Sequence, residues 1–167
     1  MRQLKVQKLT PEKFGPYGTY ADLENPQPPK LGDEFCEFFR DMILVNLGST
    51  TQASISLCRC HKRPFVIDSS EYHTFCSEGA MPLNGAMIIH VGSATPPSAD
   101  VPIKQLQAFY VPKGTFVAIK PGVWHGGPFT TTDEPVDVLI VLPERTYAND
   151  CSWHKLNEKD YIKIIGF

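Results

Sequence analysis

Short segments with the two-residue periodicity of β-strands dominate this chain of 167 residues. Turn residues interrupt them throughout, because 15 prolines and 12 glycines are spread along the sequence and form no single linker. The clearest strand covers residues 53–60, in which Ala53, Ile55, Leu57 and Arg59 share one face. Further strands are expected at residues 4–8, 86–91, 106–111, 114–119 and 136–142. Since almost no long amphipathic helix is present, the pattern predicts an all-β sandwich or barrel.

Helical structure is expected only as one or two short turns. Thr10 followed by Pro11 is typical of a helix start, with Thr10 as the N-cap and Pro11 at the first helical position. Asn157 could cap a final turn before residues 161–165. Residues 35–42 fit either a helix face or a strand, and the sequence leaves both possibilities open.

Length, charge and cysteine content narrow the class of protein. A chain of this length and composition is expected to form one domain over residues 1–167. A formal net charge of −2 gives no reason to expect nucleic acid as a partner, and no apolar run is long enough to predict a membrane partner. The five cysteines contain no CxxC pair, which favours free thiols in a cytoplasmic protein.

The candidate functional residues are two histidines and two carboxylates. Glu71 and His73 would point the same way on one strand, and Glu78 follows after a turn or on the next strand. His125 arrives from a distant hairpin, and in a closed barrel such side chains can face each other across the interior. Imidazole nitrogen and carboxylate oxygen suit Zn, Fe, Mn or Ni, although the same groups could also bind a substrate without a metal.

Arg59 is the candidate for anion binding. It shares a strand face with Ile55 and Leu57, so it is expected to project toward the barrel interior or its mouth. An arginine in that position suits a carboxylate, because its planar fork can donate two hydrogen bonds. The alternative is that the strand ends early and Arg59 turns into solvent.

The remaining chemically interesting side chains are expected to be structural. His90 is predicted to be a satisfied strand histidine, and His61 and His154 are predicted to be exposed. Cys76 lies between His73 and Glu78 in the sequence, yet no oxyanion arrangement accompanies it, so a structural thiol is expected. Trp124 could line the pocket or belong to the core.

Two sequence motifs resemble the half-motifs of a cupin. The first is His73-x4-Glu78-x6-Gly85, and the second is Pro121-Gly122-Val123-Trp124-His125. With Arg59 and the opening Thr10-Pro11-Glu12-Lys13-Phe14-x2-Tyr17-Gly18, the chain resembles the ureidoglycolate lyase family. The resemblance extends from this opening segment into the C-terminal region.

The resemblance implies a cupin-type double-stranded β-helix, a homodimer, and a role in allantoin breakdown. The implied reaction splits ureidoglycolate, a small carboxylate, into glyoxylate and urea with a divalent metal such as nickel. His73 and His125 match the family's histidines, and Arg59 matches its strand arginine. The chain departs from the family in having Glu78 in place of the usual glutamine and Gly126-Gly127-Pro128 in place of His-Pro.

The resulting hypothesis assigns each residue a role. His73, Glu78 and His125 would bind the metal (Ni, Mn or Zn) and form the catalytic group together with Glu71. Glu78 or Glu71 would serve as the base. Arg59 and Trp124 would bind the substrate. The alternatives are a non-catalytic or sensory cupin that binds a small carboxylate or sugar acid, and another metal-cupin enzyme such as an isomerase or dioxygenase.

Overall fold

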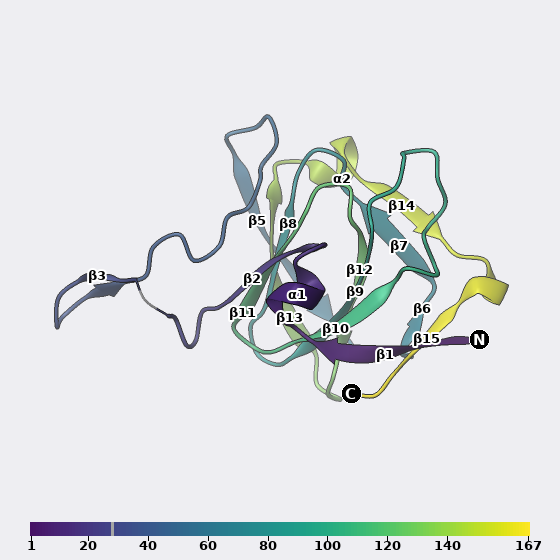
Figure 1. Ribbon diagram of the computed structural model, residues 1–167, viewed down its shortest axis with the longest axis horizontal. Coiled ribbons are helices and arrows are strands. Elements are labelled where there is room, and N and C mark those ends of the chain that lie inside the picture. Colours follow the sequence, from purple (N-terminus) through teal and green to yellow (C-terminus); the bar gives the residue numbers. More distant parts are fainter. Residues whose placement is uncertain (28) are drawn as a thin grey trace.

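β-Strands form nearly all of the regular structure in the computed structural model, which describes residues 1–27 and 29–167. Helical segments in these residues are short: α1 (Pro11–Phe14), α2 (Thr146–Asn149) and the 3-10 turn η1 (Glu158–Asp160). Most strands belong to two sheets that curl around a common interior (Figure 1), and a third sheet is a separate two-stranded hairpin. This arrangement confirms the predicted all-β, cupin-type fold with only short helical turns.

The larger sheet has eight strands and the smaller has five. In spatial order, the larger sheet contains β14 (Ser152–Lys155), β7 (Ser69–Tyr72), β12 (Trp124–Thr130), β9 (Met87–Gly92), β10 (Gln107–Val111), β1 (Arg2–Lys8), β15 (Ile162–Ile165) and β6 (Val66–Ile67). The smaller sheet contains β2 (Gly18–Asp22), β11 (Thr115–Ile119), β8 (Glu78–Pro82), β13 (Val136–Pro143) and β5 (Ala53–Cys60). Most pairs are antiparallel, but β1 runs parallel to both β10 and β15.

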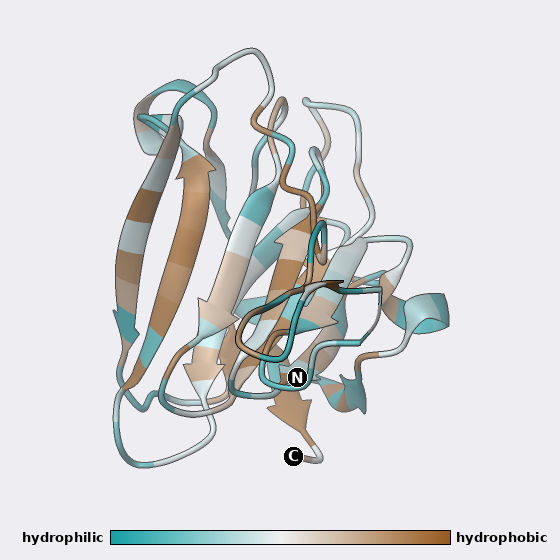
Figure 2. Ribbon diagram, turned by 90° about the vertical axis from the view of Figure 1, so that its left-hand side faces the viewer, coloured by the Kyte–Doolittle hydropathy of each residue, from teal (hydrophilic) through white to brown (hydrophobic). Residues whose placement is uncertain are grey.

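Strand β9 shows how the larger sheet separates two apolar clusters. Its residues alternate between the two faces of the sheet, and both faces are buried. Met87, Ile89 and Val91 belong to a cluster with residues of the smaller sheet, such as Val117 of β11. The opposite face contributes Ile88 to a second cluster with Trp124 and Phe129. Figure 2 shows that the apolar residues are concentrated on the strands.

The predicted helical start is confirmed in detail. Thr10 has an extended backbone, and its side-chain oxygen accepts a hydrogen bond from the backbone N–H of Lys13 at 3.3 Å. Phe14, the last residue of this turn, is fully buried against Phe109 with ring centroids 5.3 Å apart. Asn157 precedes η1 as predicted, although its side chain makes no capping hydrogen bond.

The strands expected from periodicity are all present within one or two residues of their predicted ends. The ambiguous segment 35–42 forms no helix; it contains only β4 (Glu37–Phe38), which pairs with β3 (Leu31–Gly32). This hairpin projects from the barrel (Figure 1). Its apolar side chains, including Phe35, are exposed because they have no core to cover.

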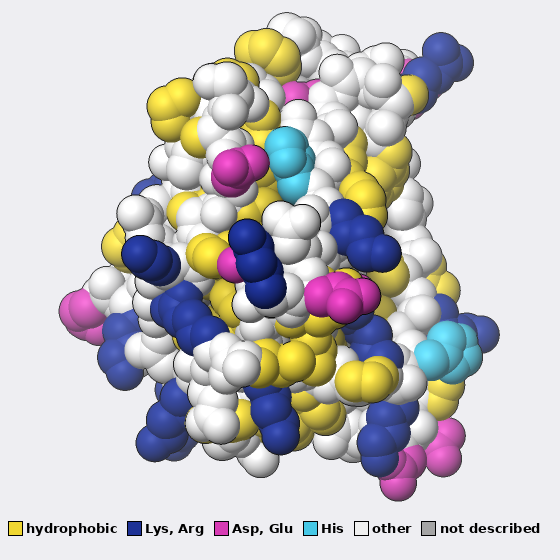
Figure 3. Space-filling model, turned by 90° about the vertical axis from the view of Figure 1, so that its right-hand side faces the viewer, with side chains coloured by type: hydrophobic (Ala, Val, Ile, Leu, Met, Phe, Trp, Pro, Cys, Tyr) yellow, Lys and Arg dark blue, Asp and Glu magenta, His cyan; other side chains and the backbone are white. Residues whose placement is uncertain are grey.

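The surface and the helices give two further observations. Figure 3 shows Lys and Arg side chains interspersed with Asp and Glu over one face, in line with the small net charge. No helix in the described part of the chain has the length and apolar character needed to cross a membrane.

Candidate active site

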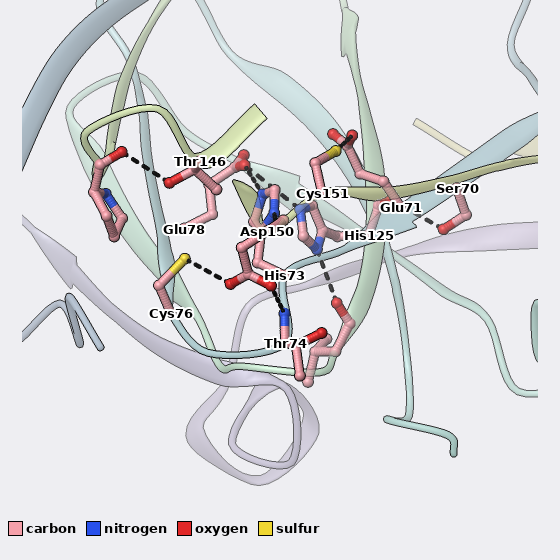
Figure 4. Close-up of polar contacts among 12 residues, drawn as sticks. Ser70, Glu71, His73, Thr74, Cys76, Glu78, His125, Thr146, Asp150 and Cys151 are labelled. Atoms are coloured by element: carbon pink, nitrogen blue, oxygen red, sulfur yellow. Dashed lines mark hydrogen bonds and ion pairs between the residues drawn. The ribbon is translucent and has the colours of Figure 1, made fainter. Parts of the chain in front are cut away.

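Three polar side chains from three separate segments converge inside the barrel. His73 follows β7, Glu78 opens β8, and His125 is the second residue of β12. The Nε2 atom of His73 lies 3.1 Å from Oε2 of Glu78, and Nε2 of His125 lies 3.5 Å from the same oxygen. Both histidines are buried, with exposed fractions of 1% and 4%. Figure 4 shows the three side chains pointing toward one another.

Backbone carbonyls fix which nitrogen of each histidine carries a proton. Nδ1 of His73 lies 2.7 Å from the carbonyl oxygen of Asp150, and Nδ1 of His125 lies 2.8 Å from that of Val123. A carbonyl oxygen can only accept a hydrogen bond, so each Nδ1 is the donor. In the neutral rings, both Nε2 lone pairs therefore face Glu78. Nε2 of His125 has no hydrogen-bond partner in the described residues.

The Nε2 lone pairs of His73 and His125 and the Oε2 atom of Glu78 repel one another unless a positive charge lies between them. Without a metal, a proton fills this role. Burial alone would raise the pKa of Glu78, but the facing His125 and His73 rings outweigh burial and bring this pKa to about 2. Burial would lower the pKa of His125, but the Glu78 carboxylate raises it overall. A protonated His125 paired with ionised Glu78 is the expected metal-free state.

The triad also meets the requirements of a divalent metal site. The potential ligand atoms of His73, Glu78 and His125 all lie within 4.8 Å of one another. Metal–ligand bonds of about 2.0–2.2 Å place neighbouring donor atoms roughly 3.0–3.5 Å apart in octahedral or tetrahedral geometry. The observed separations of 3.1 and 3.5 Å fall in this range. Histidines whose Nδ1–H is held by a carbonyl are typical of metal sites, and the triad could bind a metal.

A cavity of about 90 Å³ extends from the triad into the barrel. Apolar side chains of both sheets form most of its wall, including Met87, Ile119 and Val138. Its polar lining includes Glu78, His125, Glu71 and Tyr147. No lysine or arginine belongs to the lining in the described part of the chain. The cavity therefore joins an apolar interior to an acidic, histidine-containing end.

Glu71 joins the triad residues at this cavity, as the sequence predicts. It lies on β7 opposite His125 of β12, in register with it. The thiol of Cys151 donates a hydrogen bond to Oε2 of Glu71 at 3.1 Å. A thiol is a weak donor, so the Glu71 carboxylate retains most of its capacity to accept a proton.

The structure places Arg59 outside the cavity. Its side chain is 60% exposed and pairs with Asp137, its register partner on β13, through contacts of 2.7 and 2.9 Å. Ile55 and Leu57 on the same face are also exposed. The prediction that this face points inward is wrong, because the smaller sheet turns it outward at edge strand β5. Cys58, on the opposite face, lines the cavity instead.

Trp124 also lies away from the cavity. It precedes His125 on β12, so strand alternation directs the two side chains to opposite faces of the sheet. Trp124 is fully buried, packs edge-to-face against Tyr72, and donates its Nε1–H to the hydroxyl of Thr95 at 2.8 Å. These contacts correspond to the core alternative rather than to a pocket wall.

His61, His154 and Cys76 lie outside the triad, and the prediction for one of them, His154, is wrong. His61 is exposed as predicted, but His154 is half-buried because it packs on Tyr72 and Trp124. Cys76 is buried and donates to the carboxylate of Asp150 at 3.6 Å. Burial and the Asp150 charge raise the pKa of this thiol to about 11, so it remains protonated.

His90 is buried on the outer face of the larger sheet and is only partly satisfied. Its Nε2 lies 3.1 Å from the hydroxyl of Ser70, which donates its own proton to the carbonyl of His125 at 2.9 Å. Nε2 of His90 must therefore carry the hydrogen, and Nδ1 has no partner in the described residues. Burial lowers the pKa of His90 to about 3, which keeps the ring neutral.

Gly126 accounts for part of the chain's departure from the family pattern. A Cβ atom on Gly126 would lie 2.7 Å from Cε1 of His90, which is closer than side chains approach one another. A glycine is therefore required next to His125 for as long as His90 occupies this position. The unusual Gly126 and the buried His90 form one packing unit.

Sequence reasoning missed the segment that closes the site. Tyr147 of α2 lines the cavity, and its ring lies 6.3 Å from that of His73. The Asp150 carboxylate accepts hydrogen bonds from the backbone N–H groups of Thr74 and Phe75 at 2.7 and 2.8 Å. No local pattern in the sequence connects this segment to His73, because the contacts depend on how β14 pairs with β7.

Comparisons with known proteins identify the family of this chain and agree with the fold. The sequence model of the family described as ureidoglycolate lyase matches residues 1–163. The ureidoglycolate lyase of Rhodobacter capsulatus is 30% identical over 129 residues, which are 75% of this chain and 78% of the relative. The ureidoglycolate lyase of Pseudomonas fluorescens Pf0-1 is 26% identical over 166 residues, covering 97% and 96% of the two chains.

A solved structure supports the fold alone. The dTDP sugar isomerase of Desulfovibrio desulfuricans G20 superimposes with a TM-score of 0.53 at 15% sequence identity. The superposition covers 87% of this chain and 89% of the isomerase. A sequence identity this low supports a shared barrel architecture, but it gives no information about the reaction.

Proposed function

The chain belongs to the ureidoglycolate lyase family, and on this premise we propose that it cleaves ureidoglycolate to glyoxylate and urea in the cavity beside His73, Glu78 and His125. The observation that carries the proposal is the convergence of both Nε2 atoms on one Glu78 oxygen, with each Nδ1–H held by a backbone carbonyl. Family membership supplies the reaction, and this geometry supplies a location for it.

The reaction requires one proton to be moved. In ureidoglycolate a single carbon carries a hydroxyl, a carboxylate and the ureido nitrogen. A base removes the hydroxyl proton, the oxygen forms the carbonyl of glyoxylate, and the electron pair of the carbon–nitrogen bond leaves with urea. The departing nitrogen then takes up a proton, so one group that accepts and returns a proton is sufficient.

Glu71 is the residue best suited to move this proton. It lines the cavity, and its only hydrogen bond to a protein donor in the described residues is the weak one from Cys151. Oε2 of Glu78 is already shared by two histidines. We therefore assign the base and the subsequent proton donor to Glu71, and the structural anchor of the triad to Glu78.

A divalent metal, with nickel, manganese and zinc as the candidates, would be held by His73, Glu78 and His125. When bound, it would supply positive charge that lowers the pKa of the substrate hydroxyl and offsets the negative charge of the site. The charge balance supports this part of the proposal. An anionic substrate otherwise meets two glutamates in a cavity whose described lining holds no lysine or arginine.

The test is glyoxylate release from freshly prepared ureidoglycolate. The protein is stripped of metal and resupplied with nickel, manganese or zinc, and each rate is read against a blank without enzyme. His125→Ala removes a triad member, and His61→Ala removes an exposed histidine as the matched control. We expect metal-dependent release that is lost in His125→Ala and retained in His61→Ala.

Other results would redirect the assignment. Glyoxylate release that depends on His125 but not on added metal would support the lyase activity and exclude a metal from the mechanism. No release above the blank would contradict the proposed function. The barrel would then be tested for binding of small acids without turnover, for oxygen consumption and for sugar isomerisation.

Three broader features remain predictions. One cupin domain over residues 1–167 is supported by the family match to residues 1–163. A homodimer is supported by the resemblance and by the exposed apolar Ile55 and Leu57 on edge strand β5; light scattering on the purified protein tests it. A cytoplasmic location is supported by five cysteines that are all free thiols.

A further inference from the structure

A second cavity of about 190 Å³ lies beside the first. The two cavities share part of their walls, namely Glu71, His125 and the Gly126–Gly127 backbone. The second cavity is the more polar of the two, and its lining adds Arg63, Asp68, Ser70 and His90. Because Glu71 lines both cavities, a ligand that spans them would contact the residue assigned as the base.

Arg63 brings an uncommitted positive charge to this cavity. Its guanidinium group lies over the ring of Phe129, 3.9 Å from the centroid, which holds the side chain in place. No hydrogen bond or ion pair occupies its donors in the part of the chain that the structure describes. By contrast, the neighbouring cations Lys62 and Arg59 are paired with Asp133 and Asp137.

His90 provides a complementary acceptor at the same cavity. Its ring is 1% exposed, and its hydrogen is directed to Ser70, so its Nδ1 lone pair is left without a partner in the described residues. A buried acceptor without a donor is costly unless a ligand or water satisfies it. The cavity thus offers a cationic donor and a neutral acceptor, which fits an acid that also carries a hydroxyl or N–H group.

We propose that Arg63 binds the carboxylate of the substrate and is a specificity-determining residue of this enzyme. The inference rests on the proposed function for the identity of the substrate. Arg63 is the only lysine or arginine among the described residues that line either cavity, whereas three carboxylates line them. A substrate carboxylate is therefore attracted to one position, and its adjacent hydroxyl carbon is directed toward Glu71.

Arg63 takes the role that the sequence assigns to Arg59. Arg59 lies on β5 and Arg63 lies in the loop that follows this strand, but only Arg63 lines a cavity with no partner on its donors in the described residues. A guanidinium group can hold both oxygens of a carboxylate, so a lysine at this position would preserve the charge and lose the two-point contact.

The test measures ligand binding separately from turnover. Calorimetric titration uses glycolate, a stable hydroxy acid, and glycolamide, in which a neutral amide replaces the carboxylate. Wild-type protein, Arg63→Gln, Arg63→Lys and the matched control Lys62→Gln are compared at the same metal loading. The KM and kcat for ureidoglycolate are measured on the same samples.

We expect Arg63→Gln to weaken glycolate binding and to raise KM by about 10- to 100-fold, the loss expected for one charged hydrogen-bonding pair. Arg63→Lys should lie between this variant and wild type, and Lys62→Gln should match wild type. Glycolamide binding should not change. Because Arg63 is exposed, these substitutions are not expected to prevent folding.

Two results would overturn the inference: wild-type protein that does not prefer glycolate to glycolamide, or Arg63→Gln that binds glycolate within about twofold of wild type. The proposed function fails by a different result. If glycolate binding depends on Arg63 while no variant releases glyoxylate, the carboxylate site stands and the lyase assignment does not.

Discussion

Replacing Glu78 by glutamine should change how the stability of the metal-free protein depends on pH. The pKa of Glu78 falls from an ordinary value of 4.5 to about 2 in the folded protein because of His125 and His73. A group with a lowered folded-state pKa contributes stability above its unfolded pKa, and this contribution is lost as the pH falls through the folded value.

The size of the effect follows from the shift. The difference between a pKa of 4.5 and one of about 2 corresponds to roughly 3 kcal/mol at neutral pH, because each pKa unit is worth about 1.4 kcal/mol. Roughly 2 kcal/mol of this contribution is lost between about pH 6 and pH 3, since the second pH is still above the folded pKa. This free energy is not reduced for screening by solvent, because the Glu78 side chain is only 12% exposed.

The assay is urea unfolding in EDTA, followed by tryptophan fluorescence at several pH values. We expect the stability difference between wild type and the double variant Glu78→Gln/His125→Gln to shrink by about 2 kcal/mol from pH 6 to pH 3. His125 is replaced as well because, without the Glu78 carboxylate, burial lowers its pKa and adds a pH dependence of its own. Glu144→Gln, which removes an exposed carboxylate outside the cavity, controls for the change in net charge. Parallel curves for wild type and this double variant, within about 0.5 kcal/mol across this range, would refute the assigned ion pair.

Three further substitutions test the surroundings of the site. Gly126→Ala should destabilise the protein by about 1–3 kcal/mol in chemical unfolding, because the added methyl group clashes with the buried His90. Adding His90→Ala to this variant should recover part of the lost stability, and strictly additive losses would argue against the clash. Asp150→Ala should lower the free energy of unfolding by about 2–3 kcal/mol and weaken metal binding about 10- to 100-fold, because the carboxylate holds the turn that carries His73. An unchanged affinity for zinc in calorimetry would contradict this positioning role. Arg59→Ala should leave KM and kcat unchanged, because the side chain lies outside both cavities, and a raised KM would restore the sequence-based assignment.

Strand periodicity predicted the elements that are regular and apolar. Residues 53–60 and 136–142 alternate or are uniformly apolar, and β5 and β13 form there. Strands β7, β8 and β12 were not predicted, because polar and glycine residues that serve the site interrupt their apolar pattern. Functional demands on these strands thus obscured the signal that would have revealed them.

The sequence by itself determined the all-β class and the capped first turn, and it singled out His73, Glu78, His125 and Glu71 as candidate site residues. The all-β class and the capped turn follow from periodicity and capping residues, which are local properties of the chain, and the candidate residues stand out because their motifs resemble those of a cupin. Only the tertiary structure decided which face of a strand points inward. Alternation shows that Ile55, Leu57 and Arg59 share a face, but the curvature of the sheet and the edge position of β5 turn that face outward. The same limit explains why Arg63, in a loop without periodicity, was found beside the site only in three dimensions.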